Sequence, residues 1–135
     1  MVAKINILYY AAAATIAIAG ILHLIQAPAV LEFSLTFFIF FSVAGIAQIF
    51  WVVPMIRRWG RPWYLVGIGG TIVLIGLYAI TRMPGNPITG GGGPVSLLGL
   101  AIEVFQAAFI GLSIAIIIYE SKRKQLSGRT ASEAA

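Results

Sequence analysis

Four long apolar runs dominate the sequence and decide what the chain can fold into. The runs are about Ile5–Gln26, Leu31–Met55, Trp63–Thr81 and Val95–Tyr119. At about 1.5 Å per residue, each would form a helix of roughly 28–37 Å, enough to cross a hydrocarbon core of about 30 Å. Only 10% of the residues are charged, whereas soluble domains carry about 25%. The sequence therefore predicts an all-α, integral membrane protein with four spans.

The segments between the runs are short, which predicts an antiparallel, up-down four-helix bundle. Residues 1–119 would form this single membrane domain, and residues 120–135 a polar cytoplasmic tail. Pro28 is expected to hold Ala27 in extended geometry at the first turn, and Pro62 suits the first turn of the third helix. The stretch RMPGNPITGGGGP is the one longer irregular connection, and we expect a flexible external link or a docking surface there.

The basic residues are distributed asymmetrically along the chain. Eight of the nine precede the first run, separate the second and third, or follow the fourth: Lys4, Arg57, Arg58, Arg61, Lys122, Arg123, Lys124 and Arg129. The ninth, Arg82, follows the third run. By the positive-inside rule, both termini and the middle loop are cytoplasmic and the chain is a multi-pass protein of the cell membrane.

Six of these basic residues suggest a role for the positive charge at the membrane surface. We interpret Arg57, Arg58, Arg61, Lys122, Arg123 and Lys124 as a cytoplasmic positive anchor that contacts anionic lipids. Nearby aromatic residues, Trp59, Trp63 and Tyr64, are predicted to lie at the membrane interface. Because the charges set orientation, the net charge of +5 does not indicate nucleic-acid binding.

Small and polar residues recur at helical spacing in every run. They are Ala12, Thr15, Ala19 and His23 in the first; Ser34, Phe38, Phe41, Gly45, Gln48 and Val52 in the second; Gly67, Thr71, Leu74 and Tyr78 in the third; and Ser96, Gly99, Glu103, Gln106, Ile110 and Ser113 in the fourth. Small residues let membrane helices approach closely, and polar ones hydrogen-bond between helices. We expect these stripes to face one another in a compact bundle, with Gln48, Thr71 and Tyr78 as interhelical polar residues.

Glu103 is the one acidic residue that lies away from the ends of a predicted span. It lies about 12 Å below the external end of its helix, where an isolated charge costs about 2.5–3.5 kcal/mol. It therefore needs a proton or a partner. The predicted topology brings it to the external half of the bundle as part of a polar cluster: His23, Glu32, Arg82, Glu103 and Gln106.

Three interpretations of this cluster stay open. The first is an ion pair of Arg82 with Glu103 or Glu32, supported by hydrogen bonds. The second is a proton-handling or ligand site, because ionisable groups inside membranes are functional candidates. The third is a metal site, for which one histidine and two carboxylates are few ligands, without a supporting spacing. We predict no metal, no catalytic residue and no cofactor in this chain.

Several short motifs, in a fixed order over roughly residues 20–105, indicate a family. They are His23, Glu32 followed by Phe37-Phe38, AGIAQIFW, the glycine-rich start of the third run, TRMPGNP and Glu103. In these the chain resembles a largely uncharacterised family of small four-span membrane proteins of archaea and actinobacteria. Bacterial relatives tend to have Asn and Trp where this chain has Thr71 and Tyr78. The resemblance implies the four-span fold and no particular activity.

The small size of the chain and its predicted location almost entirely in the membrane suggest a more specific assignment. Small archaeal proteins that lie almost entirely in the membrane are similar to accessory subunits of the copper-dependent ammonia monooxygenase. That similarity implies a non-catalytic subunit that packs beside other membrane subunits, which would hold the copper and carry out the chemistry. The alternative is a small proton-coupled carrier in which Glu103 is the titrating group.

Overall fold

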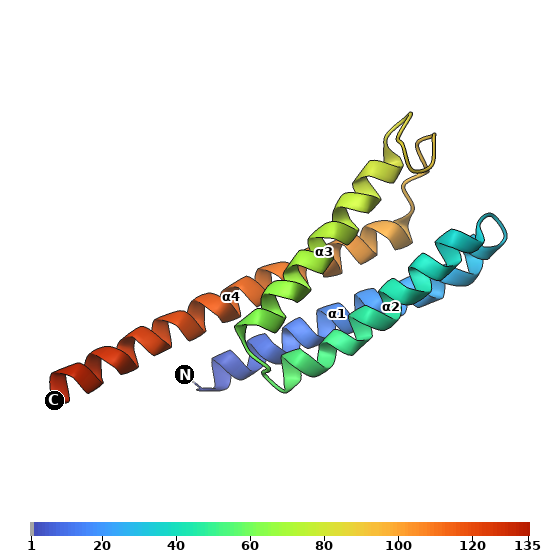
Figure 1. Cartoon of the computed structure of the whole chain (residues 1–135). Coiled ribbons are helices and arrows are strands. Elements are labelled where there is room, and N and C mark those ends of the chain that lie inside the picture. The colour runs from blue at the N-terminus through green and yellow to red at the C-terminus, as the bar shows by residue number, and fades with distance from the viewer. Residues whose placement is uncertain (1) are drawn as a thin grey trace.

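The computed structural model describes residues 2–135, and these residues form four α-helices (Figure 1). The helices are α1 (Val2–Leu31), α2 (Leu35–Ile56), α3 (Arg61–Arg82) and α4 (Leu97–Ala134). All four are long and apolar enough to cross a membrane. The prediction of four helices is confirmed, and their length and composition fit a multi-pass membrane protein.

The α1–α2 turn differs from the prediction. α1 contains Pro28 and continues to Leu31, so Ala27 is helical rather than extended. Proline near a helix end removes few hydrogen bonds, and membrane helices tolerate it when neighbouring helices pack around the site. Ser34 then begins α2 by accepting a hydrogen bond from the Phe37 amide at 3.4 Å. At the next turn, the predicted place of Pro62 in the first turn of α3 is confirmed.

α4 continues as a helix through the predicted polar tail. With 38 residues it is about 57 Å long, well beyond a hydrocarbon core of about 30 Å. Its last part is exposed and carries an ion pair between Arg129 and Glu133 at 3.0 Å. This part is rich in Lys, Arg, Glu and Ala, which are strong helix formers. Residues 120–134 thus extend the bundle as a polar helix.

The two helical hairpins meet at one end of the molecule and separate at the other (Figure 1). We call the end with the α2–α3 turn and the N-terminus the turn end, and the end with the other two connections the loop end. α1 packs along α2 and α4, and α3 packs chiefly on α4. Near the α2–α3 turn, the Trp51 indole donates to the Trp63 carbonyl at 3.1 Å. The predicted bundle forms, but it is more open at the loop end than we expected.

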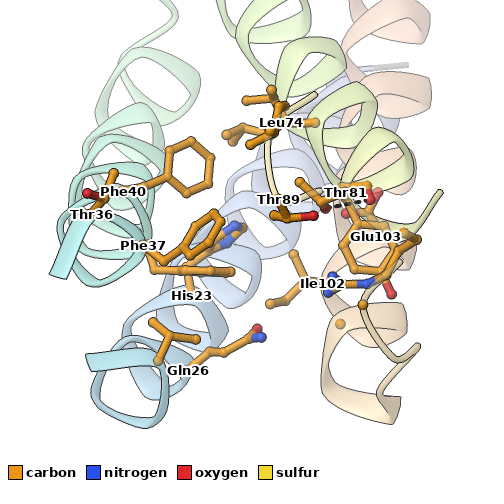
Figure 2. A pocket seen from close by; sticks show the side chains of 18 of the residues that line it. His23, Gln26, Thr36, Phe37, Phe40, Leu74, Thr81, Thr89, Ile102 and Glu103 are labelled. Carbon is orange, nitrogen blue, oxygen red and sulfur yellow. Dashed lines mark hydrogen bonds between the residues drawn. The ribbon is translucent and has the colours of Figure 1, made fainter. Parts of the chain in front are cut away.

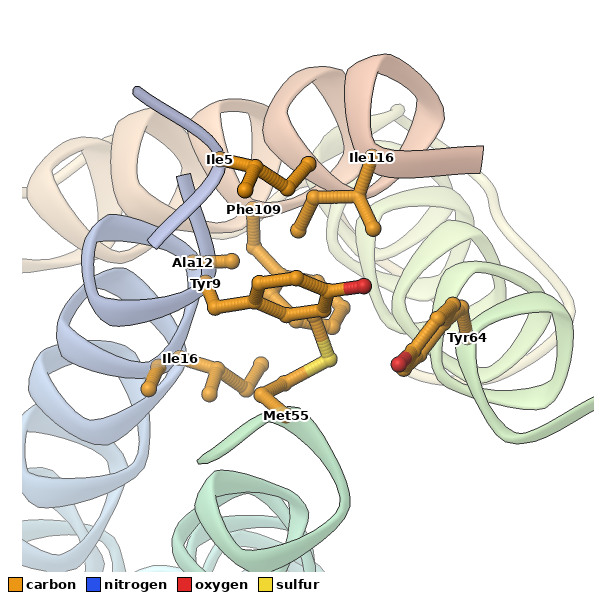
Figure 3. Packing of buried hydrophobic residues seen from close by; sticks show 9 residues of the cluster. Ile5, Tyr9, Ala12, Ile16, Met55, Tyr64, Phe109 and Ile116 are labelled. Carbon is orange, nitrogen blue, oxygen red and sulfur yellow. The ribbon is translucent and has the colours of Figure 1, made fainter. Parts of the chain in front are cut away.

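The apolar core lies toward the turn end. Side chains from all four helices form it: Ile5, Tyr9, Ala12, Ala13, Ile16, Met55, Tyr64, Phe109 and Ile116 (Figure 3). Tyr64 is fully buried and its ring lies 6.0 Å from that of Tyr9. The prediction that Tyr64 is an interfacial anchor is therefore wrong, because its position on α3 faces the other helices.

α1 and α2 approach each other closely where Gly20 meets Gly45. A Cβ atom added to Gly45 would lie 2.8 Å from the Gly20 carbonyl oxygen, and one added to Gly20 would lie 2.7 Å from the Gly45 carbonyl oxygen. The two backbones therefore touch directly, as small residues allow in membranes. Most of the small residues in the predicted stripes are buried: Ala12, Ala19, Gly45, Gly67 and Gly99.

The α3–α4 loop is folded around Asn86, whose side chain is buried. Its amide nitrogen donates to the carbonyls of Met83 at 2.9 Å and Gly91 at 3.1 Å. Its Oδ1 atom accepts from the backbone amides of Ile88 at 3.0 Å and Thr89 at 2.7 Å. These bonds replace the regular backbone pairing that a glycine-rich segment lacks. The loop therefore has a defined shape, and the Gly93 amide joins it to the end of α3 by donating to the Thr81 carbonyl at 3.2 Å.

Candidate functional site

A cavity of about 370 Å³ lies between the two hairpins at the loop end. All four helices and the α3–α4 loop contribute to its wall. Most of the wall is apolar and comes from Phe37, Phe40, Phe41, Leu74, Leu77 and Ile102. Figure 2 shows His23 and Gln26 reaching in from α1, with Glu103 and Thr81 on the opposite side. The compact bundle that the sequence predicts is therefore not filled at this end, because the hairpins diverge here.

The α1 side of the cavity carries His23 and Gln26. The Nδ1 atom of His23 lies 3.0 Å from the Ala19 carbonyl oxygen, which can only accept, so Nδ1 carries the proton in the neutral ring. That leaves Nε2 as a hydrogen-bond acceptor. The imidazole also packs against Phe41, with 5.5 Å between ring centroids. His23 is thus held in one orientation by its own helix and by α2.

The α3–α4 side carries Tyr78, Arg82 and Glu103. The Arg82 guanidinium lies over the Tyr78 ring, 4.5 Å from its centroid. A Cβ atom on Gly93 would come within 2.7 Å of an Arg82 nitrogen, so the loop packs directly on the guanidinium. In residues 2–135 no ion pair joins Arg82 to Glu103 or to Glu32. The cation–π contact takes the place of the ion pair that we considered from the sequence.

Three polar atoms of the cavity-lining residues have no hydrogen-bond partner. They are Gln26 Oε1, the Tyr78 hydroxyl and Arg82 Nε, and each is shielded from water. An unsatisfied buried polar group costs about 1–3 kcal/mol. Gln26 and Arg82 have several rotatable bonds, so their polar ends can turn toward a molecule in the cavity. The polar end of the cavity therefore offers hydrogen bonds that the chain itself does not use.

A second compartment continues from the cavity along the groove between α2 and α3. It measures about 580 Å³ and shares Thr36, Phe40 and Leu74 with the first compartment. Its lining is almost entirely apolar and includes Val43 and Val66, which are both 60% exposed. The two compartments therefore adjoin. The first holds the polar groups at the loop end, and the second lies toward the middle of the helices.

The structure brings together part of the predicted polar cluster. His23, Arg82 and Glu103 line the first compartment. Glu32 is exposed in the α1–α2 turn and does not line it. Gln106 lies one turn deeper on α4, fully buried, and its amide has no hydrogen-bond partner. The predicted interhelical residues divide between the compartments, because Tyr78 lines the first while Gln48 and Thr71 line the second.

Sequence reasoning missed a polar network at the turn end. The buried Tyr9 hydroxyl donates to the Glu120 carboxylate, and Arg58 lies over the Tyr9 ring at 4.5 Å and hydrogen-bonds Asn6. Tyr9 and Glu120 are 111 residues apart, so no local signal could have paired them. The other members of the predicted positive anchor are exposed at this same end: Arg57, Arg61, Lys122, Arg123 and Lys124.

The cavity has the composition of a small-molecule pocket. Pockets that hold small molecules are typically apolar with a few polar groups that orient the ligand. Within the described part of the chain, no three His, Cys, Asp or Glu side chains gather where they could hold a metal ion. No family model, curated protein or solved structure with which we compared the chain matches it.

Proposed function

We propose that this chain is a non-catalytic membrane subunit that holds an amphipathic molecule between its two hairpins. The observation that carries the proposal is a pair of adjoining cavities, one with polar groups in its wall and the other almost entirely apolar. A molecule with a polar head and an apolar chain matches this division. Its head would meet His23, Tyr78 and Arg82, and its chain would lie against α2 and α3.

The position of the apolar compartment supports access from the bilayer. Ile39, Val43 and Val66 line it and are more than half exposed. In a membrane, such exposed apolar side chains contact lipid tails. An amphiphile could therefore enter sideways between α2 and α3 without passing through water.

The test is to identify what the purified protein retains. We expect organic extraction and native mass spectrometry to find an amphiphile bound to the protein after mild detergent purification. Leu77→Trp places a bulky ring in the first compartment and should abolish retention. Ile80→Trp makes the same change on an exposed position of α3 outside the cavity, and should retain the molecule. Wild-type protein that carries no amphiphile in repeated preparations would contradict the proposal.

The subunit role and its complex rest on the sequence resemblance. We propose that the chain packs beside other membrane subunits, and the ammonia monooxygenase is the complex that the resemblance favours. Copper would then reside in the neighbouring subunits. Native electrophoresis of gently solubilised membranes should place the chain in a large assembly that contains those subunits. Migration as a monomer or homodimer would contradict the subunit role.

The orientation that we propose has both termini and the α2–α3 turn in the cytoplasm. The structure supports it in that Lys4, Arg57, Arg61 and Lys122 are exposed at one end of the bundle, as the positive-inside rule requires. We expect reporter fusions after Arg129 and in the α2–α3 turn to read cytoplasmic, and a fusion within residues 90–93 to read external. An externally located C-terminal reporter would reverse the assignment.

A second candidate is the proton-coupled carrier, which the place of Glu103 in the cavity wall favours. Glu103 has no ion-pair partner in residues 2–135, so it is available to exchange a proton during transport. Reconstituted vesicles distinguish the two candidates. A pH-driven flux that disappears in Glu103→Gln, with folding intact, would favour the carrier, and an absence of flux favours the binding subunit.

A further inference from the structure

We propose that the molecule in this site is an uncharged amphiphile with an apolar chain and a head that bears carbonyl or hydroxyl oxygens. This inference rests on the binding function proposed above and names the class of ligand. Isoprenoid quinones and long-chain isoprenoid alcohols share this chemistry. Three features of the site lead to it: the charges of the first compartment's wall, its free hydrogen-bonding groups and the apolar compartment that adjoins it.

The charges of the wall argue against an ionic head group. Arg82 and Glu103 line the same compartment from neighbouring helices, without a direct ion pair. An anionic head attracted to Arg82 would also lie close to the acidic Glu103 side chain. A cationic head attracted to Glu103 would likewise lie close to Arg82. An ion would moreover lose its hydration in a largely apolar cavity, which is costly. An uncharged head avoids both penalties.

The free hydrogen-bonding groups indicate oxygen atoms on the head. The Tyr78 hydroxyl and Arg82 Nε can each donate, and neither has a partner. Both sit on the same side of α3, because residues four apart share a helix face. On the opposite wall, Gln26 can donate through its amide nitrogen and accept through its unpartnered oxygen. A head with acceptor oxygens would satisfy the donors, and aromatic rings of α2 would cover its faces.

The place where the two compartments adjoin bears on the apolar chain. Phe40 and Thr36 of α2 and Leu74 of α3 line both compartments. A chain attached to a head in the first compartment would pass these three side chains to reach the apolar groove between α2 and α3.

The test measures binding of two molecules that share a chain and differ in the head. The probes are a menaquinone with four isoprene units and geranylgeraniol, which has the same tetraprenyl chain with a hydroxyl head. Phytane, a hydrocarbon without a head group, is the control. We expect at least one of the two oxygen-bearing probes to raise the thermal unfolding temperature in detergent, because a ligand that binds only the folded state stabilises it, and phytane to have no effect. The menaquinone should also quench Trp51, which lines the apolar compartment.

Variants test the head and the chain separately. Tyr78→Phe should weaken binding of the oxygen-bearing probe roughly fivefold to tenfold, as expected for one lost hydrogen bond. Tyr10→Phe removes a hydroxyl from an exposed residue of α1 and should leave binding unchanged. Leu74→Trp should obstruct the place where the two compartments adjoin and abolish binding of tetraprenyl probes, whereas the chainless naphthoquinone menadione should still bind. Val73→Trp, on an adjacent exposed position, is the matched control.

Three outcomes would overturn the inference. One is equal stabilisation by phytane, which would show that the head is not recognised. Another is unchanged affinity in both Tyr78→Phe and Leu74→Trp when these variants unfold at the wild-type temperature. The third is recovery of a phospholipid as the retained molecule, which would leave the binding function in place and refute the ligand class. Recovery of no amphiphile at all would refute the binding function itself.

Discussion

Gly45→Val should separate α1 from α2 and lower the free energy of unfolding by about 3 kcal/mol or more, at the upper end of the cost of overpacking. The added Cβ atom would lie 2.8 Å from the Gly20 carbonyl oxygen and 2.8 Å from Leu24 Cγ. Leu24 can change its rotamer, but the Gly20 carbonyl belongs to a helical backbone and cannot move alone. The two helices must therefore move apart along their most extensive interface.

The matched control is Gly111→Val on α4. A Cβ atom at Gly111 meets no other atom within 4 Å, so this change adds the same atoms without a clash. Unfolding by titration with sodium dodecyl sulfate, followed by circular dichroism and tryptophan fluorescence, measures both variants. Gly20→Ala should behave like Gly45→Val, because its Cβ atom would lie 2.7 Å from the Gly45 carbonyl oxygen. Equal stability of Gly45→Val and Gly111→Val would show that the glycine contact does not hold the hairpin.

The four helical spans could be predicted from the sequence because few backbone structures are possible inside a bilayer. Every backbone polar group in lipid must be paired inside its own segment, so a long apolar run becomes a helix. The buried face of each helix also followed from spacing, as Ala19 on α1 and Gly99 on α4 show. Pro28 was misinterpreted because the rule for the residue before proline is weaker than the packing that holds Ala27 against its neighbours.

The cavity could not be predicted, because it depends on how the helices tilt. The Gly20–Gly45 contact brings α1 and α2 together, while α3 meets α2 chiefly where Trp51 packs against Gly67 near the turn. The residues that form these contacts are far apart in the sequence. A stripe of small residues does not indicate the angle between two hairpins. The sequence indicated a compact bundle since small residues occur on all four helices.

Arg82 illustrates how a nearer partner can be overlooked. We considered Glu103 and Glu32 as partners because they are the acidic residues in the external half of the predicted bundle. Tyr78 lies four residues before Arg82, which places the two on one face of α3, and the guanidinium lies over its ring. The spacing was present in the sequence and could have indicated the cation–π contact. By contrast, nothing local could have indicated that Tyr9 reaches Glu120.

Phe109→Ala should destabilise the turn end of the bundle by about 3 kcal/mol, the low end of the range for a buried phenylalanine. The Phe109 side chain is fully buried in a cluster that includes Tyr9, Met55 and Tyr64 (Figure 3). It also touches α3, since its ring tip lies 3.2 Å from the place of a Cβ atom on Gly67. Removing the ring would therefore leave a void where α4 meets the other three helices.

We expect the cost of Phe109→Ala to lie at the low end of this range because the protein is surrounded by lipid rather than by water. In lipid, apolar side chains gain little by leaving their surroundings, so the loss comes mainly from van der Waals contacts and from the void. Phe33→Ala deletes the same atoms from a side chain that is 86% exposed, and should cost less than about 1 kcal/mol. Phe109→Leu fills much of the void and should recover about half of the loss. If Phe109→Ala and Phe33→Ala unfold at the same detergent concentration, the cluster around Phe109 does not hold the two hairpins together, and α3 must be attached through Trp51 and the turn alone.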